Sequence, residues 1–362
     1  MLIRFTEKGL YVEAAGVYID PWKPVAKALI THGHSDHARW GHSQYICVES
    51  SVPILKHRLG DIIVSGKKFA ETFSINGVEF SFHPAGHIIG SAQIRVAHKG
   101  EVWVVSGDYK VENDGISEAF EPVACQHFIT ESTFGLPVFK WKPQSQVFDD
   151  MMEWWQRNAS DKRTSLISAY SLGKAQRILK GLSSDWPGPV YAHGAIFSIH
   201  EILKTEGWDL PEILPMPPGM EVPDIHQALV IAPPGAIGSS WQKRLKDPVS
   251  AAASGWMGMR GTRRRSAVDR GFVLSDHADW DGLNQAIDAT GATSVYVTHG
   301  YTDIFSKWLL DKGYDAHIVK TEYGSDQEEI LNAEADDLKA SQENAGSNMR
   351  ENISASENES ML

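Results

Sequence analysis

The segment Thr31–His37 constrains this chain more than any other part of its sequence. It reads Thr-His-Gly-His-Ser-Asp-His and places three imidazoles and one carboxylate within six residues, directly after the apolar run Ala28–Ile30. A compact loop presents such side chains toward one point, and neutral imidazoles and carboxylates suit Zn or Mn without any thiolate. The alternative interpretation is a histidine-rich surface turn, which the candidates downstream disfavour.

Three single residues in similar contexts complete a ligand set. His87, Asp108 and His299 each follow a β-type run, at the end where a sheet would present them. Each of them alone would be read as a core or turn residue. With the first cluster they provide enough ligands for two divalent ions, Zn or Mn, and Asp108 is the natural bridging carboxylate at a metal separation of about 3.5–4 Å. The predicted ligands are His32, His34, Asp36, His37, His87, Asp108 and His299.

The order of expected elements predicts a domain with an insertion. Short β-type runs dominate the first part, and helices and strands alternate from about residue 144, with one helix expected over 239–245. After residue 271 a strand, expected over 272–274, and helices return. Alternation of strands and helices indicates a parallel α/β sheet. The predicted parts are a first domain over 1–140, an inserted α/β domain over 141–270, a return segment over 271–325, and a tail over 326–362.

Charge is unevenly distributed along the chain. The formal net charge is −12, and the segment 326–362 carries −8 of it through ten acidic and two basic side chains. This segment has almost no aromatic residues, so we predict that it is disordered. The remaining −4 is compatible with a local basic cleft, because net charge does not decide what a focused site binds.

Features of targeting and redox chemistry are sparse. The sequence contains no apolar run long enough for a transmembrane helix and no signal-peptide core, so we expect a cytoplasmic protein without membrane contact. Cys47 and Cys125 are the two cysteines and form no CxxC pair, so we expect buried, unliganded thiols.

The ligand loop, taken with the later histidines and aspartate, resembles the metallo-β-lactamase superfamily. Asp20, in Ile19-Asp20-Pro21, is similar to the structural aspartate that braces the ligand loop there. Over about residues 8–320 the chain further resembles the β-CASP nucleases, which include the pre-mRNA cleavage endonuclease, ribonuclease J and the Artemis class. The segments that carry this resemblance are 85–92, 106–109, 130–135, 170–176, 274–279 and 297–300.

This resemblance implies an αββα metallo-β-lactamase sandwich with an inserted parallel α/β β-CASP domain. It implies one ion on His32, His34, His87 and Asp108, a second on Asp36, His37, Asp108 and His299, and a bridging hydroxide as nucleophile. It also implies that His277 protonates the departing 3′ oxygen and that Glu131 orients it. A histidine held by a carboxylate can stay protonated near neutral pH, whereas the alternatives are a surface histidine and a capping glutamate.

The substrate expected from the resemblance is nucleic acid. The opening stretch is most similar to bacterial ligase-associated DNA-damage-response exonucleases, which favours a DNA exonuclease acting from the 5′ end in repair, with a DNA ligase and a helicase as partners. His299 favours RNA instead, because Artemis-type DNA enzymes commonly lack that histidine. We therefore expect DNA, with an RNA-processing ribonuclease, a small-molecule metallohydrolase and a non-catalytic scaffold as alternatives.

Two basic groups are candidates for substrate binding. Arg260, Arg263, Arg264 and Arg265 lie beside Trp256, a combination that suits a phosphate backbone and a stacked base, although a solvated loop is the plainer interpretation. Lys174 and Arg177 open a predicted helix after Gly173, where the helix N-terminus also favours anions. If the insert caps the metal site, we expect these two side chains to face the same cleft as the arginines.

Overall fold

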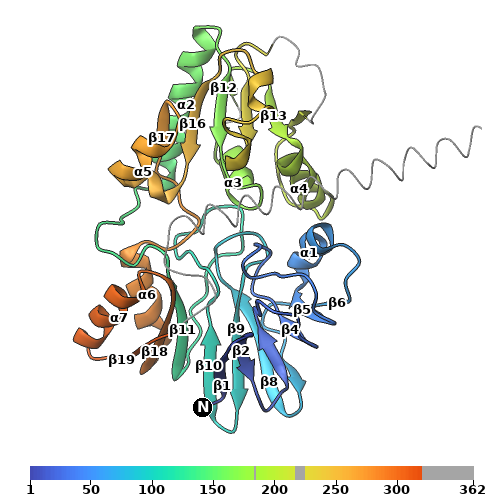
Figure 1. The fold of residues 1–362 in the computed structure, drawn as a ribbon, viewed down its shortest axis with the longest axis vertical. Coiled ribbons are helices and arrows are strands. Elements are labelled where there is room, and N and C mark those ends of the chain that lie inside the picture. The colour runs from blue at the N-terminus through green and yellow to red at the C-terminus, as the bar shows by residue number, and fades with distance from the viewer. Residues whose placement is uncertain (183–184, 217–224, 320–362) are drawn as a thin grey trace, which may run out of the picture.

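The computed structural model describes residues 1–182, 185–216 and 225–319. In this part of the chain, two sheets stack in the lower half of the molecule and a third sheet forms the upper half (Figure 1). The first sheet contains, in spatial order, β1 (Ile3–Thr6), β2 (Gly9–Val12), β3 (Val17–Ile19), β4 (Ala28–Leu29), β5 (Tyr45–Val48) and β6 (Val64–Lys67). The second sheet, ordered β19-β18-β11-β10-β9-β8-β7, contains β7 (Phe73–Ile75), β8 (Val78–Pro84), β9 (Ala92–His98), β10 (Glu101–Val105), β11 (His127–Ser132), β18 (Ser294–Gly300) and β19 (Asp315–Ile318).

Alternating side chains form the core between these two sheets. In β8, Val78, Phe80 and Phe82 are fully buried, whereas Glu79 between them is exposed. The buried face packs in one cluster with residues of the first sheet such as Val12. Removing each such apolar side chain from water contributes about 1.5–3 kcal/mol, and the alternation therefore fixes which face of β8 turns inward.

Helices cover both outer faces of the stacked sheets. Helix α1 (Val52–Leu59) packs Leu55 against the first sheet, and helices α6 (Trp280–Thr290) and α7 (Thr302–Asp311) pack against the second. The layers are thus helix, sheet, sheet and helix, which confirms the predicted sandwich.

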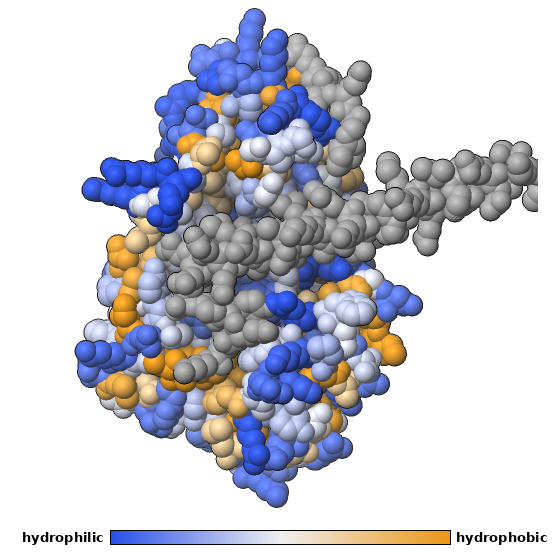
Figure 2. All heavy atoms as spheres, viewed as in Figure 1, coloured by the Kyte–Doolittle hydropathy of each residue, from blue (hydrophilic) through white to orange (hydrophobic). Residues whose placement is uncertain are grey.

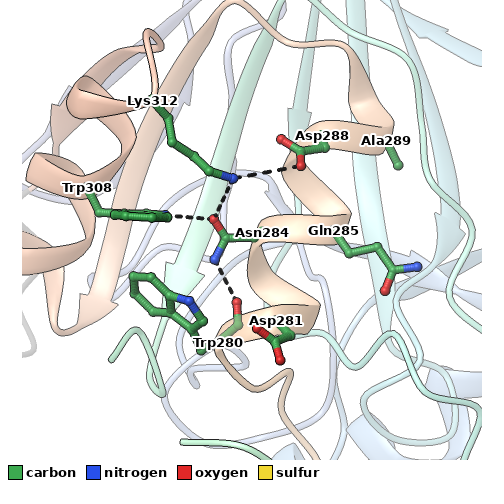
Figure 3. Close-up of a pocket in the computed structure, with 8 residues that line it drawn as sticks. All are labelled: Trp280, Asp281, Asn284, Gln285, Asp288, Ala289, Trp308 and Lys312. Atoms are coloured by element: carbon green, nitrogen blue, oxygen red, sulfur yellow. Dashed lines mark hydrogen bonds and ion pairs between the residues drawn. The ribbon is translucent and has the colours of Figure 1, made fainter. Parts of the chain in front are cut away.

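A side-chain junction joins α6 to α7 (Figure 3). Asn284 Oδ1 accepts hydrogen bonds from Trp308 Nε1 at 2.8 Å and Lys312 Nζ at 3.2 Å. The Asn284 amide donates to the Trp280 carbonyl at 2.7 Å. This contact helps to fix the return segment, which carries the loop before α6 and the end of β18.

The third sheet is entirely parallel, in the order β14-β13-β15-β12-β16-β17. Its strands are β12 (Ser165–Ser168), β13 (Val190–His193), β14 (Leu214–Met216), β15 (Leu229–Ala232), β16 (Val249–Ala253) and β17 (Arg270–Phe272). The helices connected to it are α2 (Gln144–Ser160), α3 (Lys174–Gly181), α4 (Gly194–Thr205) and the short α5 (Arg260–Arg265). Single 3-10 turns cover Glu49–Ser51, Pro234–Ala236, Gln242–Arg244 and Gly255–Gly258. The predicted inserted parallel α/β fold is confirmed.

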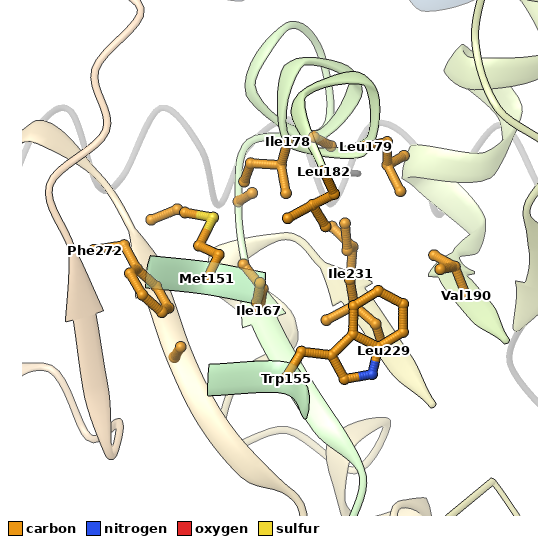
Figure 4. Packing of buried hydrophobic residues seen from close by; sticks show 14 of the residues in the cluster. Met151, Trp155, Ile167, Ile178, Leu179, Leu182, Val190, Leu229, Ile231 and Phe272 are labelled. Atoms are coloured by element: carbon orange, nitrogen blue, oxygen red, sulfur yellow. The ribbon is translucent and has the colours of Figure 1, made fainter. Parts of the chain in front are cut away.

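Helix α2 forms because its apolar residues recur at helical spacing. Met151 and Trp155, one turn apart and each 1% exposed, point from α2 onto the sheet near Ile167, Ile231 and Phe272 (Figure 4). Truncating one such side chain to alanine typically costs about 2–5 kcal/mol. The inserted domain therefore has a core of its own.

Some expected elements differ from the structure. The helix expected over 239–245 is only the 3-10 turn Gln242–Arg244, because Pro248 disfavours helical backbone at Asp247 and Gly238 precedes the segment. The strand expected over 272–274 is β17, shifted to Arg270–Phe272. Both cysteines are buried, as expected. In the part of the chain that the structure covers, no helix has the length and apolarity needed to cross a membrane. The tail predicted over 326–362 lies outside the described residues.

Candidate metal centre

Asp20 braces the ligand loop that follows β4. Its Oδ1 accepts a hydrogen bond from the Thr31 amide at 2.8 Å, and its Oδ2 accepts one from the Thr31 hydroxyl at 2.6 Å. The same Oδ2 lies 2.8 Å from Nδ1 of His37. On the other side, a Cβ at Gly107, where φ is +59°, would lie 2.7 Å from the Thr31 Cβ, so this close approach requires glycine. The loop is therefore held between two fixed neighbours.

Three imidazoles converge in front of this loop. Nδ1 of His34 lies 3.2 Å from Nε2 of His32 and 3.1 Å from Nε2 of His87. The far nitrogen of His34 lies 3.2 Å from the Leu172 carbonyl. The far nitrogen of His87 lies 2.9 Å from the Asp276 carbonyl.

These carbonyls decide which ring nitrogens carry protons. A carbonyl oxygen only accepts, so the protons of neutral His34 and His87 lie on the far nitrogens. The near nitrogens then point lone pairs at each other, an arrangement that is repulsive unless a cation lies between them. The three imidazoles consequently fit a divalent ion, and the carbonyls orient His34 and His87 as ligands.

Asp108, in the loop after β10, lies at the middle of the constellation. Its Oδ2 is 3.4 Å from Nε2 of His32 and 3.8 Å from Nε2 of His87. It is also 3.5 Å from Nε2 of His37. The donor atoms of His32, His34, His87 and Asp108 all lie within 4.8 Å of one another. This carboxylate is thus placed where it could serve two ions.

A second donor group contains His32, Asp36 and His37, again within 4.8 Å. Nδ1 of His37 is hydrogen-bonded to Asp20, and its Nε2 lies 3.7 Å from Asp36 Oδ2. That Nε2 is buried and has no hydrogen-bond partner in the structure. A buried imidazole nitrogen without a partner is costly, and a metal ion would satisfy it.

His299 lies at the edge of this second group. It is the extra residue of a bulge between β11 and β18, since Glu131 pairs with Thr298 and Ser132 with Gly300. Its φ is +51°. The bulge aims the imidazole toward His37, with ring centroids 5.7 Å apart. Among the described residues, His299 is outside the donor groups that lie within 4.8 Å, although it lines a small cavity with Asp36 and His37.

His277 and Glu131 form a pair beside the first group. Nδ1 of His277 lies 2.9 Å from Oε2 and 3.1 Å from Oε1 of Glu131. Glu131 is 1% exposed, and its Oε1 also accepts a hydrogen bond from the Tyr109 amide at 2.8 Å. The ring of His277 lies 4.5 Å from that of His87. Although burial disfavours its charge, the carboxylates of Glu131 and Asp108 raise the pKa of His277 to about 9.

Burial and charge separate the pKa values of the other groups. Burial lowers the pKa of His32 and of His87 well below the usual range, so these imidazoles are neutral and offer lone pairs. Burial also disfavours a charge on His37, but Asp108 and Asp36 raise its pKa well above the usual range. Burial disfavours ionised Asp108, yet His37 and His277 lower its pKa well below the usual range. The centre therefore combines two neutral imidazoles, those of His32 and His87, with an ionised Asp108 and with a His37 ring whose positive charge the carboxylates favour.

The structure places the predicted basic residues in two different environments. Lys174 and Arg177 on α3 are each 2% exposed, and both pair with Asp276, at 3.3 and 3.0 Å. Because a buried carboxylate already pairs with both cations, their contact with substrate stays a prediction. Arg260, Arg263, Arg264 and Arg265 lie on α5, which has no buried residue and from which hydrophilic side chains project (Figure 2).

Several groups around the centre escape prediction from sequence. The Leu172 carbonyl and the Tyr109 amide act through the main chain, which no residue type reveals. Asp276 directly precedes His277, and that position was the available signal for it. Trp141 donates from Nε1 to the His277 carbonyl at 3.0 Å across 136 positions of sequence.

Comparison with known proteins gives relatives but no matching family model. A "Probable DNA ligase" of Opitutus terrae is 29% identical over 320 residues, which are 86% of this chain and 30% of that protein. "Cleavage and polyadenylation specificity factor 73" of Drosophila melanogaster is 27% identical over 169 residues, 44% of this chain and 24% of that protein. "RNase aCSPSF2" of Saccharolobus solfataricus is 27% identical over 142 residues, 37% of this chain and 28% of that protein. The chain is thus similar to proteins named for DNA ligation, for pre-mRNA cleavage and polyadenylation, and for RNA cleavage.

The chain spans only part of these relatives, 30% of the length of the first and less of the other two. A solved protein of unknown function from Enterococcus faecalis V583 has a TM-score of 0.54 at 11% identity, covering 82% of this chain and 80% of that one. That similarity supports the fold alone.

Proposed function

We propose that this chain is a two-metal phosphodiesterase that hydrolyses nucleic acid. The observation that carries the proposal is the adjacency of two donor groups that share His32, with Asp108 Oδ2 within 3.5 Å of His32 and of His37 and the His277–Glu131 pair beside them. Names of the relatives support it, since they include "Endoribonuclease YSH1" and "RNase aCSPSF2". A small-molecule hydrolase would need the donor groups but not the histidine–glutamate pair.

The proposed metal ions are two Zn or Mn ions per chain. His32, His34, His87 and Asp108 would hold one of them, and Asp36, His37, Asp108 and His299 would hold the other. When bound, such ions supply Lewis-acid charge beside a water molecule and a phosphoryl oxygen.

The chain's own residues supply the remaining steps. Asp20 and the Leu172 and Asp276 carbonyls hold the imidazoles in one tautomer and orientation. Asp36, one-third exposed, stands at the accessible side of the centre, where it orients the attacking water. Protonated His277 donates its proton to the 3′ oxygen as the bond from phosphorus to that oxygen breaks, and Glu131 stabilises the charged ring before transfer.

DNA is the proposed substrate, cleaved stepwise from the 5′ end in a repair context that includes a ligase and a helicase. The DNA-ligase-named relative supports this choice because it matches 86% of the chain, whereas the RNA-processing relatives match shorter parts. RNA is the second candidate, and the printed names of those relatives together with His299 favour it.

Matched oligonucleotides test the proposal. Purified protein with Mn or Zn is incubated with DNA and RNA of one sequence, each with a 5′ phosphate or a 5′ hydroxyl, beside an Asp36→Ala/His37→Ala double variant. Stepwise loss from the 5′ end of DNA, absent in the double variant, is the expected result. Faster cleavage of RNA would replace DNA by the second candidate, and no cleavage of either polymer would overturn the nuclease proposal.

A further inference from the structure

A groove of about 310 Å³ lies where the chain enters and leaves the inserted domain. Its walls come from the linker before α2, the start of α2, the segment that leads into α5, and β17. The charged residues that line it are Lys140, Lys142, Asp150, Arg263 and Arg270, and Trp141 lies among them. In Figure 1 this region lies on the side of α5, between the upper and lower halves of the molecule.

The groove is positively charged in a chain of net charge −12. It has four cationic side chains and one carboxylate, Asp150. Lys140 pairs with Asp281 outside the lining, at 2.9 Å, whereas Lys142 forms no ion pair in the described part of the chain. The excess of positive charge is complementary to a phosphate backbone.

Two of these cations are held in place by neighbouring groups. Nε and Nη2 of Arg263 donate to the Met257 carbonyl at 3.1 and 2.8 Å, although the residue is exposed. The guanidinium of Arg270 lies 4.8 Å from the centre of the Phe272 ring. Oriented guanidinium groups lose less conformational entropy when they bind an anion than freely moving side chains do.

Trp141 connects the groove to His277. Its Nε1 donates to the His277 carbonyl at 3.0 Å, and its amide donates to Asp279 Oδ2 at 2.9 Å. Its ring packs edge-on against Phe134 at 4.8 Å, and the Phe134 ring lies 6.0 Å from the His277 ring. Trp141, which lines the groove, is thus linked to the proposed proton donor both directly and through Phe134.

We infer that this groove binds the nucleic-acid strand on the 5′ side of the scissile phosphate. The inference rests on the proposed function: His277 protonates the departing 3′ oxygen, and that oxygen belongs to the nucleotide on the 5′ side. A strand that continues past His277 in that direction reaches Trp141 and then the cations. Lys142, Arg263 and Arg270 take its phosphate, and the indole edge of Trp141 supplies an apolar wall for a base.

A pair of double variants tests this assignment. Lys142→Gln/Arg263→Gln removes two charges from the groove, and Lys243→Gln/Lys246→Gln removes two exposed charges from the inserted domain outside the lining. The groove variant is expected to raise KM for an oligonucleotide about tenfold or more, with kcat nearly unchanged. Its slope of log binding constant against log salt should fall by one to two, roughly one per phosphate contact. The control variant should change KM less than about twofold.

Position along the strand is tested at the first cut, with substrates that carry one uncharged methylphosphonate each, either at the 5′ terminus or at the linkage next to the scissile one on its 3′ side. In the parent protein, neutralising the 5′-terminal phosphate, which is next to the scissile phosphate on its 5′ side, should slow the first cut, and in the groove variant it should add little. Interference limited to the 3′ side, or equal effects of the two double variants, would overturn the inference.

A photo-crosslinking amino acid at Val138, which lines the groove and is 66% exposed, gives a readout without loss of charge. It should crosslink to the 5′ part of the strand, whereas the same group at Ile304 on α7 should not. Failure of the nuclease proposal is distinct, since the parent would then cleave neither DNA nor RNA. If the protein cleaves normally but shows no crosslink at Val138, the groove does not bind the strand, whereas the proposed nuclease function stands.

Discussion

The stacked sheets and the inserted domain bury polar groups for different purposes. In the stacked sheets, His32, His87, Asp108 and Glu131 are nearly inaccessible and point into one shared space. In the inserted domain, the charged pair that is buried, Lys174 and Arg177, meets a single carboxylate at the junction. At the candidate metal centre, imidazole lone pairs and carboxylate charge are left without partners. At the junction, both cations pair with a carboxylate of the protein.

This difference separates chemistry from positioning. The inserted domain reaches the candidate centre through the Leu172 carbonyl, which contacts His34, and through Arg177, which holds the Ser275–His277 segment by the Ser275 carbonyl and the Asp276 carboxylate. Its exposed charge lies on α5 and around the groove beside Trp141. Under the proposed function, the stacked sheets would carry the reacting groups, and the insert would orient them and hold the strand.

The largest effect is expected from Asp108→Asn. Replacing the shared carboxylate removes charge from both donor groups, so metal content should fall and the cleavage rate should drop by about 10³-fold or more. Elemental analysis and a cleavage assay on one sample measure both. Asp61→Asn, at an exposed loop position, is the matched control and should leave both values unchanged.

His277→Ala should separate proton transfer from metal binding. The variant is expected to keep its ions and to lose about 10²- to 10⁴-fold in turnover, because a positioned general acid contributes that much. His317→Ala, at an exposed histidine, is the control. If the His277→Ala protein cleaves at the parent rate, His277 is not the general acid.

Glu131→Gln should shift the pH dependence. The Glu131 carboxylate raises the pKa of His277, so its loss should deprotonate the ring at lower pH. Activity that needs the protonated ring would then decline at lower pH than in the parent, and at neutral pH it should fall by about tenfold or more. The pH–rate profiles of the two proteins check this, and an unmoved alkaline limb would contradict the assigned pair.

Arg177→Met and Met151→Ala should distinguish positioning from stability. Each is expected to destabilise the protein by about 2–5 kcal/mol. Arg177→Met leaves the Asp276 carboxylate with fewer partners, and Met151→Ala opens a cavity in the core. Arg177→Met alone should also lower kcat, by about tenfold, since the segment it holds carries His277 and supports His87. Urea unfolding and turnover per folded molecule separate the two effects, and an equal loss of kcat in both variants would place Arg177 among ordinary core contacts.

The smallest effect is expected from Asn284→Ala at the α6–α7 junction. Loss of its partly exposed hydrogen bonds should cost about 1 kcal/mol of stability and leave cleavage unchanged. Thermal unfolding measures the cost. A change in kcat here would show that the outer helices influence the centre.

Residue spacing was sufficient to predict much of the sandwich and the convergence of the ligands. Loops that follow strands meet at one edge of stacked sheets. The ligand-rich loop Thr31–His37 and the single ligands His87 and Asp108, which also follow strands, could therefore be expected to lie close together. The structure places His299 slightly apart from the other ligands. Its position is set by a bulge, and the sequence around His299 does not reveal that bulge because it arises from pairing with the distant residues Glu131 and Ser132.

The substrate side was less predictable. Lys174 and Arg177 resemble anion-binding residues at a helix start until the position of Asp276 is known, and that contact spans about a hundred residues. The same limit hides the groove, whose wall joins Trp141 to Arg270 from opposite ends of the insert. Local patterns reveal candidates, whereas long-range pairing decides whether a charge is free to bind.

The central claim is most directly tested by metal titration of chelator-stripped protein, with bound ions and DNA cleavage measured on the same sample. The account predicts no cleavage by the stripped protein and maximal cleavage once two Zn or Mn ions are bound per chain. Full cleavage with no ion bound, or with only one, would contradict it.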